Sequence, residues 1–414
     1  MSPQSLATWL TYLEQLHPKA IDLGLDRVQQ VAAKLQLLPY PIFAITVTGT
    51  NGKGSCCTLL EKILQAQGYK VGVYTSPHLL TYNERVRING IDIDDASLCE
   101  TFAKIEQTRG TISLTYFEFG TLAALILFKQ ANLDIVILEV GMGGRLDAVN
   151  IIDADIAIIS TVAIDHTEWL GFDRETIGFE KAGIMRSHKP VICGDFATPQ
   201  SVIDYANNVG AKLYLQAKDF GYEKGTTWSW WSLQQKLENL PQPKIELQNA
   251  ATVLKALELL PAHFAVSPSA ITTGLEQVVI PGRFQIIPGP VLQIFDVAHN
   301  PAATALLAQK LQALFCTGRT LAVVAMLHDK DYENALMPLL EQIDNWFVGG
   351  LSVARGGSSQ VLAECLHKHT TKPVQAFATV TDAYNAALTE AHPGDQVVIF
   401  GSFYTVAEAL RVRL

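Results

Sequence analysis

The stretch Thr48–Ser55, TGTNGKGS, carries the residue types of a phosphate-binding loop. It follows an apolar, β-branched run and precedes leucines and isoleucines at helical spacing. Backbone N–H groups at the start of a helix bind phosphate oxygens, and glycines let a ligand approach the main chain. The usual formula G-x-x-x-x-G-K-[ST] fails, because Val47 stands five positions before Gly52 and Gly54 follows Lys53. The strand–loop–helix context nevertheless favours a phosphate site over a solvated glycine turn.

Three further polar groups follow apolar runs that read as strands. Ser76 ends YKVGVYTS, Glu139 lies in DIVILEV, and Asp165, His166 and Glu168 follow DIAIIST. Open parallel sheets bind ligands at the carboxyl ends of their strands, so these residues are candidates for one site. A buried carboxylate such as Glu139 needs a cation, which Mg²⁺ or Arg145 would supply. His166 alone is more often structural; as a ligand it would suggest a second metal site, since Mg²⁺ prefers oxygen.

Other candidates carry weaker signals when taken one at a time. Lys181 lies in GFEKAGIMR, where composition alone favours a surface lysine, although a lysine near a metal can be carbamylated. Asn249 at a helix start and Asp296, His299 and Asn300 in IFDVAHNPAA are each more often caps or turn residues. Arg283 lies in a proline-rich stretch, from which a basic residue could reach a phosphate.

The elements that must position these residues form two α/β blocks. Apolar runs at residues 42–48, 69–76, 134–140, 155–161 and 189–194 alternate with helical stretches, including 55–68, which is typical of a parallel sheet covered on both faces. Residues 279–290 contain three prolines and two glycines, as linkers do. Runs at 291–297, 321–327, 345–353 and 396–402 then restart the alternation. We expect a domain at 1–284 and a smaller α/β domain at 285–414, hinged near Pro281–Pro290, with a ligand cleft between them.

Composition restricts the class of protein. The chain has 414 residues, of which 49% are hydrophobic and 17% charged, so it has enough apolar side chains to fill the cores of folded domains. A net charge of −9 argues against a general nucleic-acid or anionic-membrane surface. The sequence shows no membrane-spanning run, no signal peptide and no disulfide framework among its six cysteines, which predicts a cytoplasmic protein. Nothing in it requires more than a monomer.

Taken in order, the motifs resemble those of a known family. TVTGTNGKGS, YTSPHL with NERVRING, LEVGMGGRLDAVN, DHTEWLG, EKAGI and DVAHNP are similar to the motifs of the folylpolyglutamate synthase branch of the Mur ligase superfamily. The match is dense from about residue 20 to residue 303, and beyond it rests on the α/β pattern and IFGSFYTVAEAL. In that family a loop ending G-K-G-[ST] is the normal form, which would explain the failed formula.

The resemblance implies an ATP-dependent ligase that forms an acyl phosphate and passes the acyl group to L-glutamate. It implies a P-loop-containing, mostly parallel sheet in the N-terminal domain. It also implies two Mg²⁺ sites, a carbamylated Lys181, and catalytic roles for Lys53, Lys181 and His166. The residues implied to contact the nucleotide are Thr50, Asn51, Gly52, Lys53, Gly54, Ser55, Asn249, Arg283 and Asp296. Those implied to bind metal are Ser76, Glu139 and His166, and His299 and Ser402 are weaker candidates for glutamate.

The implied substrates are dihydropteroate and reduced folates, and no nucleic acid or membrane. Their pocket would be formed by three stretches: Asp22, Leu23, Gly24 and Leu25; Thr115, Tyr116, Phe117 and Glu118; and Leu146, Asp147 and Ala148. The first stretch favours a bifunctional dihydrofolate and folylpolyglutamate synthase, although IDLGLDRV also reads as a simple helix start. The alternatives are a monofunctional folylpolyglutamate synthase, a ligase of UDP-linked sugar peptides, for which only about forty residues precede the loop, and a nucleotide-binding regulator.

Overall fold

The computed structural model describes residues 3–353 and 355–413. The chain divides into two compact units. Unit 1 comprises Met1–His78 and Tyr82–Val279, and unit 2 comprises Leu79–Thr81 and Ile280–Leu414. The change of unit at Val279 lies close to the expected boundary at residue 284. Within the described ranges, no helix combines the length and apolar character that crossing a membrane requires.

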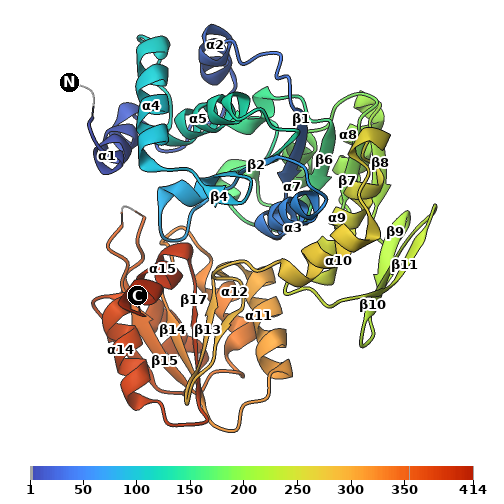
Figure 1. The fold of residues 1–414 in the computed structure, drawn as a ribbon. Coiled ribbons are helices and arrows are strands. Elements are labelled where there is room, and N and C mark those ends of the chain that lie inside the picture. Colours follow the sequence, from blue (N-terminus) through green and yellow to red (C-terminus); the bar gives the residue numbers. More distant parts are fainter. Residues whose placement is uncertain (1–2, 354, 414) are drawn as a thin grey trace. The chain divides into compact units, whose positions relative to one another are not determined.

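Unit 1 is built on a mostly parallel sheet with the strand order β4-β3-β2-β5-β1-β6-β7-β8 (Figure 1). Only the β2–β3 and β3–β4 pairings are antiparallel. The strands are β1 (Phe43–Thr48), β2 (Val71–Tyr74), β3 (Val86–Ile88), β4 (Ile91–Asp92), β5 (Ile135–Glu139), β6 (Ile156–Ile159), β7 (Pro190–Cys193) and β8 (Lys212–Leu215). Strand β1 is fully buried from Ala44 to Thr48, as a near-continuous apolar run predicts for a central strand.

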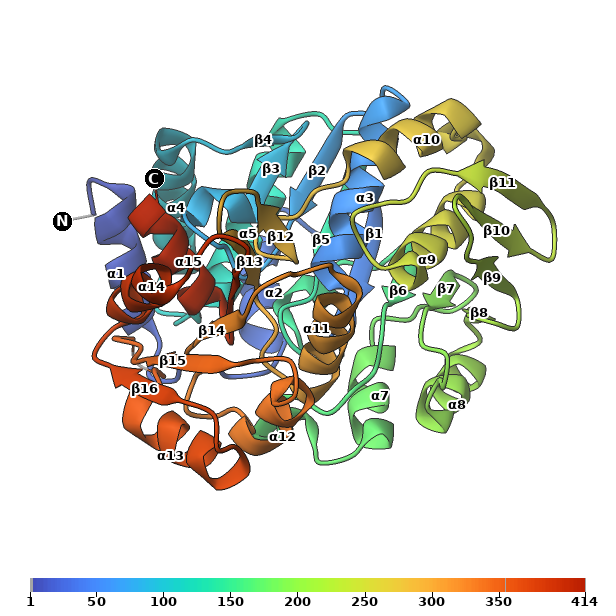
Figure 2. The same ribbon diagram turned by 90° about the horizontal axis from the view of Figure 1, so that it is seen from below.

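Helices cover both faces of this sheet (Figure 2). On one face α5 packs with α1, α2 and α4, and on the other α3 packs with α9 and α10. The helices are α1 (Leu6–Leu16), α2 (Asp26–Lys34), α3 (Lys53–Ala66), α4 (Asp95–Arg109), α5 (Tyr116–Gln130), α6 (Thr167–Leu170), α7 (Arg174–Ala182), α8 (Gln200–Val209), α9 (Leu247–Glu258) and α10 (Pro268–Gln277). Short 3₁₀ turns occur at η1 (Tyr82–Arg85), η2 (Ala148–Ile151) and η3 (Ala262–Phe264). The expected α/β class with a parallel sheet is therefore confirmed.

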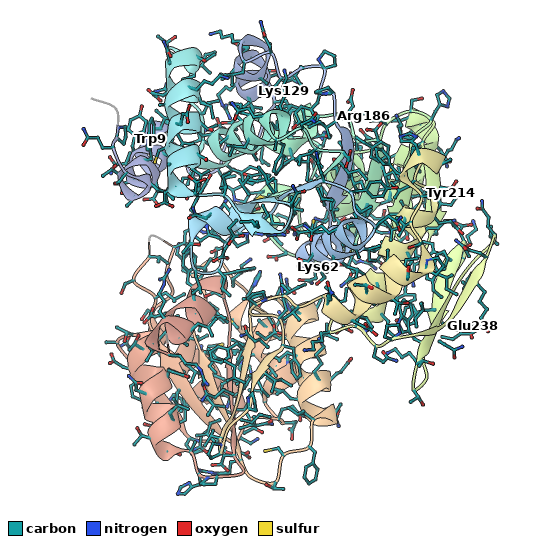
Figure 3. All side chains as sticks on the ribbon, viewed as in Figure 1. Trp9, Lys62, Lys129, Arg186, Tyr214 and Glu238 are labelled. Carbon is teal, nitrogen blue, oxygen red and sulfur yellow. The ribbon has the colours of Figure 1, made fainter. Side chains whose placement is uncertain are left out.

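A small antiparallel sheet, which the sequence pattern did not indicate, is appended to unit 1. Its strands are β9 (Phe220–Glu223), β10 (Trp228–Ser232) and β11 (Lys236–Leu240), in the order β11-β10-β9. Trp230 is fully buried and its indole N–H donates to the carbonyl of Ala251 on α9. Glu238 lies on the outer strand (Figure 3). The buried side chain of Trp230 therefore attaches this sheet to helix α9 of unit 1.

Unit 2 has a second sheet, with the order β12-β13-β17-β14-β15-β16. Its strands are β12 (Gln285–Ile287), β13 (Leu292–Asp296), β14 (Thr320–Val324), β15 (Asn345–Gly349), β16 (Val374–Phe377) and β17 (Gln396–Phe400). Its helices are α11 (Pro301–Ala313), α12 (Tyr332–Leu336), η4 (Met337–Leu339), α13 (Ser359–His369), α14 (Val380–Glu390) and α15 (Phe403–Arg413). All pairings are parallel except β12–β13, so part of the expected linker forms an edge strand between Pro281 and Pro288.

Unit 2 also contains Leu79–Thr81, three residues from the chain that follows β2. Leu79 is 7% exposed and belongs to an apolar cluster with Val297 and Val406. The guanidinium of Arg411 on α15 donates to the carbonyl of Leu80 at 2.9 Å. Unit 2 is thus assembled from two separate parts of the chain.

Replacing Trp9 by alanine is expected to lower the free energy of unfolding of unit 1 by about 3–5 kcal/mol, the usual cost of removing a buried large aromatic side chain. Trp9 on α1 (Figure 3) is 1% exposed. Its ring meets that of Phe102 on α4 edge to face, with 5.8 Å between the ring centres. The measurement is urea denaturation followed by circular dichroism. Leu233→Ala, at a side chain that is 76% exposed, is the control; equal effects of the two substitutions would contradict the assigned packing.

Candidate active site

The glycine loop joins β1 to α3, and its geometry explains its sequence. Helix α3 begins at Lys53, two residues before the expected start, because Gly52 takes a left-handed conformation (φ +89°) as its N-cap. A Cβ on Gly52 would lie 2.4 Å from Oδ1 of Asn249. The ammonium of Lys53 donates to the carbonyls of Gly49 (2.8 Å) and Thr50 (3.3 Å). The structure thus brings Asn249, predicted from a distant motif, against the loop.

The loop is also hydrogen-bonded to the chain that leaves β6. The amide of Thr50 donates to the carbonyl of Thr161 at 2.8 Å. The hydroxyl of Ser160, which is fully buried, donates to the carbonyl of Asn51 at 2.6 Å. A Cβ on Gly49 would lie 1.9 Å from this same Ser160 Oγ, so the close approach requires glycine. Ser160 and Thr161 were missed in the sequence, where the only signal is a pair of hydroxyls at the end of an apolar run.

Ser76 and Glu139 lie side by side. The amide of Ser76 donates to Oε2 of Glu139 at 3.4 Å, and Glu139 is 4% exposed at the carboxyl end of β5. Arg145, the rival partner for Glu139, is instead paired with Glu180 at 2.8 Å. Among the described residues no group of three or more His, Cys, Asp and Glu side chains gathers to hold a metal ion.

The glycines of GMGG serve close contacts within the protein. A Cβ on Gly141 would lie 2.7 Å from the ring of Phe117, and one on Gly144 would lie 2.9 Å from the carbonyls of Glu180 and Lys181. Gly143 has a φ of +66° and faces Leu170. The sequence indicated close approach by the backbone, and its partners are α5, α6 and α7.

Lys181 is buried, whereas composition alone favoured a surface lysine. Its side chain lies in the last turn of α7 and is 3% exposed. Burial, and after it the like charge of Lys53, lower the pKa of Lys181 from its ordinary value to about 7, against the opposing effect of Asp165 and Asp147. A substantial fraction of this amine is therefore neutral near pH 7.

His166 follows β6 and caps the short helix α6. It takes a left-handed conformation, with φ 52° and ψ 43°, which is uncommon for a residue with a Cβ. The side chain is partly buried, as is that of its neighbour Asp165, whereas Glu168 is exposed. The chain just before them is fixed by Asp195, whose Oδ2 accepts from the amide of Val162 at 2.7 Å.

The three stretches predicted to form the substrate pocket meet in unit 1. The amide of Gly24 donates to the carbonyl of Leu146 at 3.2 Å. Arg27 on α2 bridges Asp22 (2.6 Å) and Glu118 (3.2 Å), and Glu118 forms the capping box of α5 with Thr115. Leu25 is the N-cap of α2, so this stretch does start a helix. Arg27 was missed because its second partner, Glu118, is distant in sequence.

Of the remaining pocket residues, Tyr116 and Phe117 open α5 and are partly exposed, Leu23 and Leu146 are also partly exposed, and Ala148 begins η2. Asp147 is 3% exposed and accepts hydrogen bonds from the amides of Met142 (2.9 Å) and Val149 (3.0 Å). Burial raises the pKa of Asp147 to about 7, in spite of these hydrogen bonds.

The other predicted residues lie in unit 2. Asp296 ends β13, accepts from the amides of Phe284 and Ala298 at 2.8 Å each, and has its pKa raised by burial. The guanidinium of Arg283 lies over the ring of Phe403, 5.4 Å from its centre. His299 Nδ1 lies 2.8 Å from the carbonyl of Val297, and Asn300 caps α11. Ser402 is buried before α15, and its Oγ accepts from the amide of Thr405 at 3.0 Å.

Two family models match the chain. The Mur ligase middle domain matches residues 47–242, and the Mur ligase glutamate ligase domain matches residues 282–403. The chain is 49% identical over 408 residues to the dihydrofolate synthase/folylpolyglutamate synthase of Escherichia coli strain K12, covering 98% of this chain and 95% of that protein.

Solved structures agree with these matches. An Escherichia coli structure described as in complex with DHPP and ADP has a TM-score of 0.95 at 48% identity, covering 100% of this chain and 98% of the other. A bifunctional folylpolyglutamate synthase/dihydrofolate synthase with Mn, AMPPNP and L-glutamate bound has a TM-score of 0.93 at 47% identity, covering 100% of both chains. With both family models in the expected order and near-complete relatives at this identity, the chain belongs to the Mur ligase family, in its dihydrofolate synthase/folylpolyglutamate synthase branch.

Proposed function

We propose that the protein joins L-glutamate to 7,8-dihydropteroate, forming dihydrofolate, and to reduced folates, forming folylpolyglutamates. The observation that carries the proposal is the presence, in one unit, of a phosphate-type loop, the Ser76–Glu139 pair and three stretches joined by the Gly24–Leu146 hydrogen bond and the Arg27 ion pairs. A relative of 49% identity bears both activities in its name. The relatives' complexes with ADP, and with AMPPNP, Mn and L-glutamate, support ATP, a divalent metal and glutamate as the other reactants.

The nucleotide would bind at residues Thr50–Ser55. The amides of the first turn of α3 point along the helix axis toward its N-terminus, where they and the helix dipole favour phosphate oxygens. Lys53, whose ammonium is held near the loop by the carbonyls of Gly49 and Thr50, would add a positive charge beside the terminal phosphates. Asn249 packs against the loop and would complete this side of the site, and Arg283 and Asp296 of unit 2 are the further proposed nucleotide contacts.

Ser76, Glu139 and His166 would hold Mg²⁺, with two ions as the proposed number. The buried Glu139 carboxylate beside Ser76 has the oxygen chemistry that this ion prefers. When bound, the ions neutralise charge on the transferring phosphoryl group. The residues themselves contribute by fixing where that charge can be neutralised, at the carboxyl edge of the sheet.

The proposed reaction, which the family resemblance implies, has two chemical steps. A substrate carboxylate attacks the γ-phosphorus of ATP, forming a carboxyl–phosphate bond as the bond to ADP breaks. The amino group of L-glutamate then attacks the acyl carbon, an amide bond forms, phosphate leaves and a proton is released. Most of the rate enhancement comes from holding the reactants in line and from fixed charges around the phosphoryl group. His299 and Ser402 in unit 2 are the weaker candidates for contacting glutamate.

Lys181 is proposed to act as a carbamate. Its neutral amine would add to CO₂, giving an N-carboxylate and releasing a proton. The pKa of about 7 makes the required neutral form available at physiological pH, and burial excludes the water that would surround an exposed lysine. The carbamate would replace a buried cation by an anion suited to a site rich in cations.

The deciding assay supplies ATP, Mg²⁺ and L-glutamate with either dihydropteroate or tetrahydrofolate. Glutamate-dependent phosphate release is expected with both substrates. Release with tetrahydrofolate alone would establish the monofunctional alternative instead. Release with neither substrate would refute the proposed function.

Carbamylation of Lys181 is expected to be detectable by ¹³C NMR after equilibration with ¹³C-bicarbonate. The carbamate signal should grow as the pH rises through about 7, because the neutral amine is the reactive form. Lys181→Arg, whose side chain stays charged, should lack the signal and lose activity by about 100-fold or more. Lys212→Arg, at an exposed position on β8, is the control; a signal that survives Lys181→Arg would count against the modification.

A further inference from the structure

Two threonine hydroxyls fasten the glycine loop to the chain that leaves β6, and they do so reciprocally. Oγ1 of Thr50 donates to the carbonyl of Ala163 at 2.9 Å and accepts from the amide of the same residue at 3.0 Å. Oγ1 of Thr161 donates to the carbonyl of Asn51 at 3.0 Å and accepts from its amide at 3.1 Å. Each segment thus supplies one hydroxyl that satisfies both backbone groups of a residue in the other. We call these four residues the threonine clasp.

The clasp begins where the sheet ends. The parallel register of β1 and β6 stops at Thr48 and Ile159, and the amide of Ser160 still donates to the carbonyl of Thr48 at 2.9 Å. Beyond that point a backbone hydrogen bond still runs from the amide of Thr50 to the carbonyl of Thr161 at 2.8 Å, and the hydroxyls of Thr50 and Thr161 add the four bonds of the clasp. The two loops are therefore held together past the end of the sheet largely by side-chain hydroxyls.

The segment that follows β6 is also held by hydrogen bonds between Val162 and the side chains of Asp195 and Arg174. The carboxylate of Asp195 accepts from the amide of Val162 at 2.7 Å, and Nε of Arg174 donates to the carbonyl of Val162 at 2.9 Å. Arg174 also pairs with Asp195 at 2.9 Å. Val162 is fixed from this side and its neighbours Thr161 and Ala163 from the loop side. His166 follows three positions after Ala163, so the segment that leads to it starts from residues held on both sides.

We propose that the threonine clasp couples nucleotide binding at the glycine loop to metal binding at His166. The side chains of Thr50 and Thr161 act as positioning residues, because their hydroxyls are engaged with backbone groups and hold the loops in register. The inference deepens the proposed function and rests on its assignment of residues Thr50–Ser55 to ATP and of His166 to metal.

Coupling of this kind is reciprocal and measurable. If the clasp transmits position between the loops, bound metal strengthens nucleotide binding by some factor, and bound nucleotide strengthens metal binding by the same factor. A merely structural role would lower the melting temperature and leave this factor unchanged.

The test compares Thr50→Val, Thr161→Val and the double variant with the unmodified protein. Valine keeps the shape and removes the hydroxyl. Calorimetry gives the dissociation constant of AMPPNP with EDTA and with Mn²⁺, and electron paramagnetic resonance gives Mn²⁺ binding with and without AMPPNP. Each single variant is expected to reduce the coupling factor about 3- to 10-fold, the range for one or two hydrogen bonds. The double variant should fall short of the product of the two, since both hydroxyls hold one joint.

Two controls and one substitute variant make the result decisive. Thr101→Val removes a buried hydroxyl that bonds only to the carbonyl of Ser97 within α4, and should leave the factor unchanged. Thr161→Ser retains a hydroxyl and should restore the coupling. If Thr161→Val fails to fold, Thr161→Ala takes its place. An unchanged coupling factor in the folded hydroxyl-free variants overturns the clasp.

AMPPNP binding by the Lys53→Ala variant shows whether the clasp or the assignment of the loop to ATP is wrong. If Lys53→Ala binds AMPPNP like the unmodified protein, the assignment of the loop to ATP is wrong. If Lys53→Ala loses binding while the valine variants keep full coupling, the assignment stands and the clasp alone is refuted.

Discussion

The parallel pairing of β1 with β5 on one side and β6 on the other is the constraint on which the candidate site depends. In this register Val47 lies opposite Glu139, and Thr48 lies opposite Ile159. Three chain segments therefore leave the sheet at one level and in one direction, because parallel strands present their carboxyl ends together. The glycine loop, the buried carboxylate and the approach to His166 are neighbours through this register, although nearly ninety residues separate Thr50 from Glu139.

The sequence was informative wherever a signal is local. Apolar β-branched runs indicated the central strands, and a glycine cluster between a strand and a helix indicated the loop. The placement of Glu139 at a strand end was also correct. The sequence could not tell what the glycines of GMGG approach, because Phe117 and the carbonyls of α7 are far away in the chain. For the same reason the Arg145–Glu180 pair was not foreseen. Lys181 is buried, although composition alone favoured a position on the surface.

Burial also explains a shared property of two ionisable groups in unit 1. The pKa of Asp147 rises to about 7 and that of Lys181 falls to about 7, and desolvation is the largest cause of both shifts. A low-dielectric interior favours the uncharged form of either group, so opposite starting values converge. Composition and spacing cannot reveal such a shift, since it depends on how completely the folded chain excludes water from each side chain.

The route of the chain through Leu79–Thr81 has a consequence for how the protein is divided experimentally. Because unit 2 takes three residues from between β2 and η1, neither unit is one continuous stretch of sequence. A fragment that starts at residue 280 would lack Leu79 and would uncover the apolar side chains of Val297 and Val406. A fragment that ends at residue 279 would leave Leu79 without that cluster. Limited proteolysis or gene truncation at the proline-rich stretch would therefore give pieces with a defect in packing, and unit 2 would need its short insert supplied in trans or grafted on to fold as it does in the whole chain.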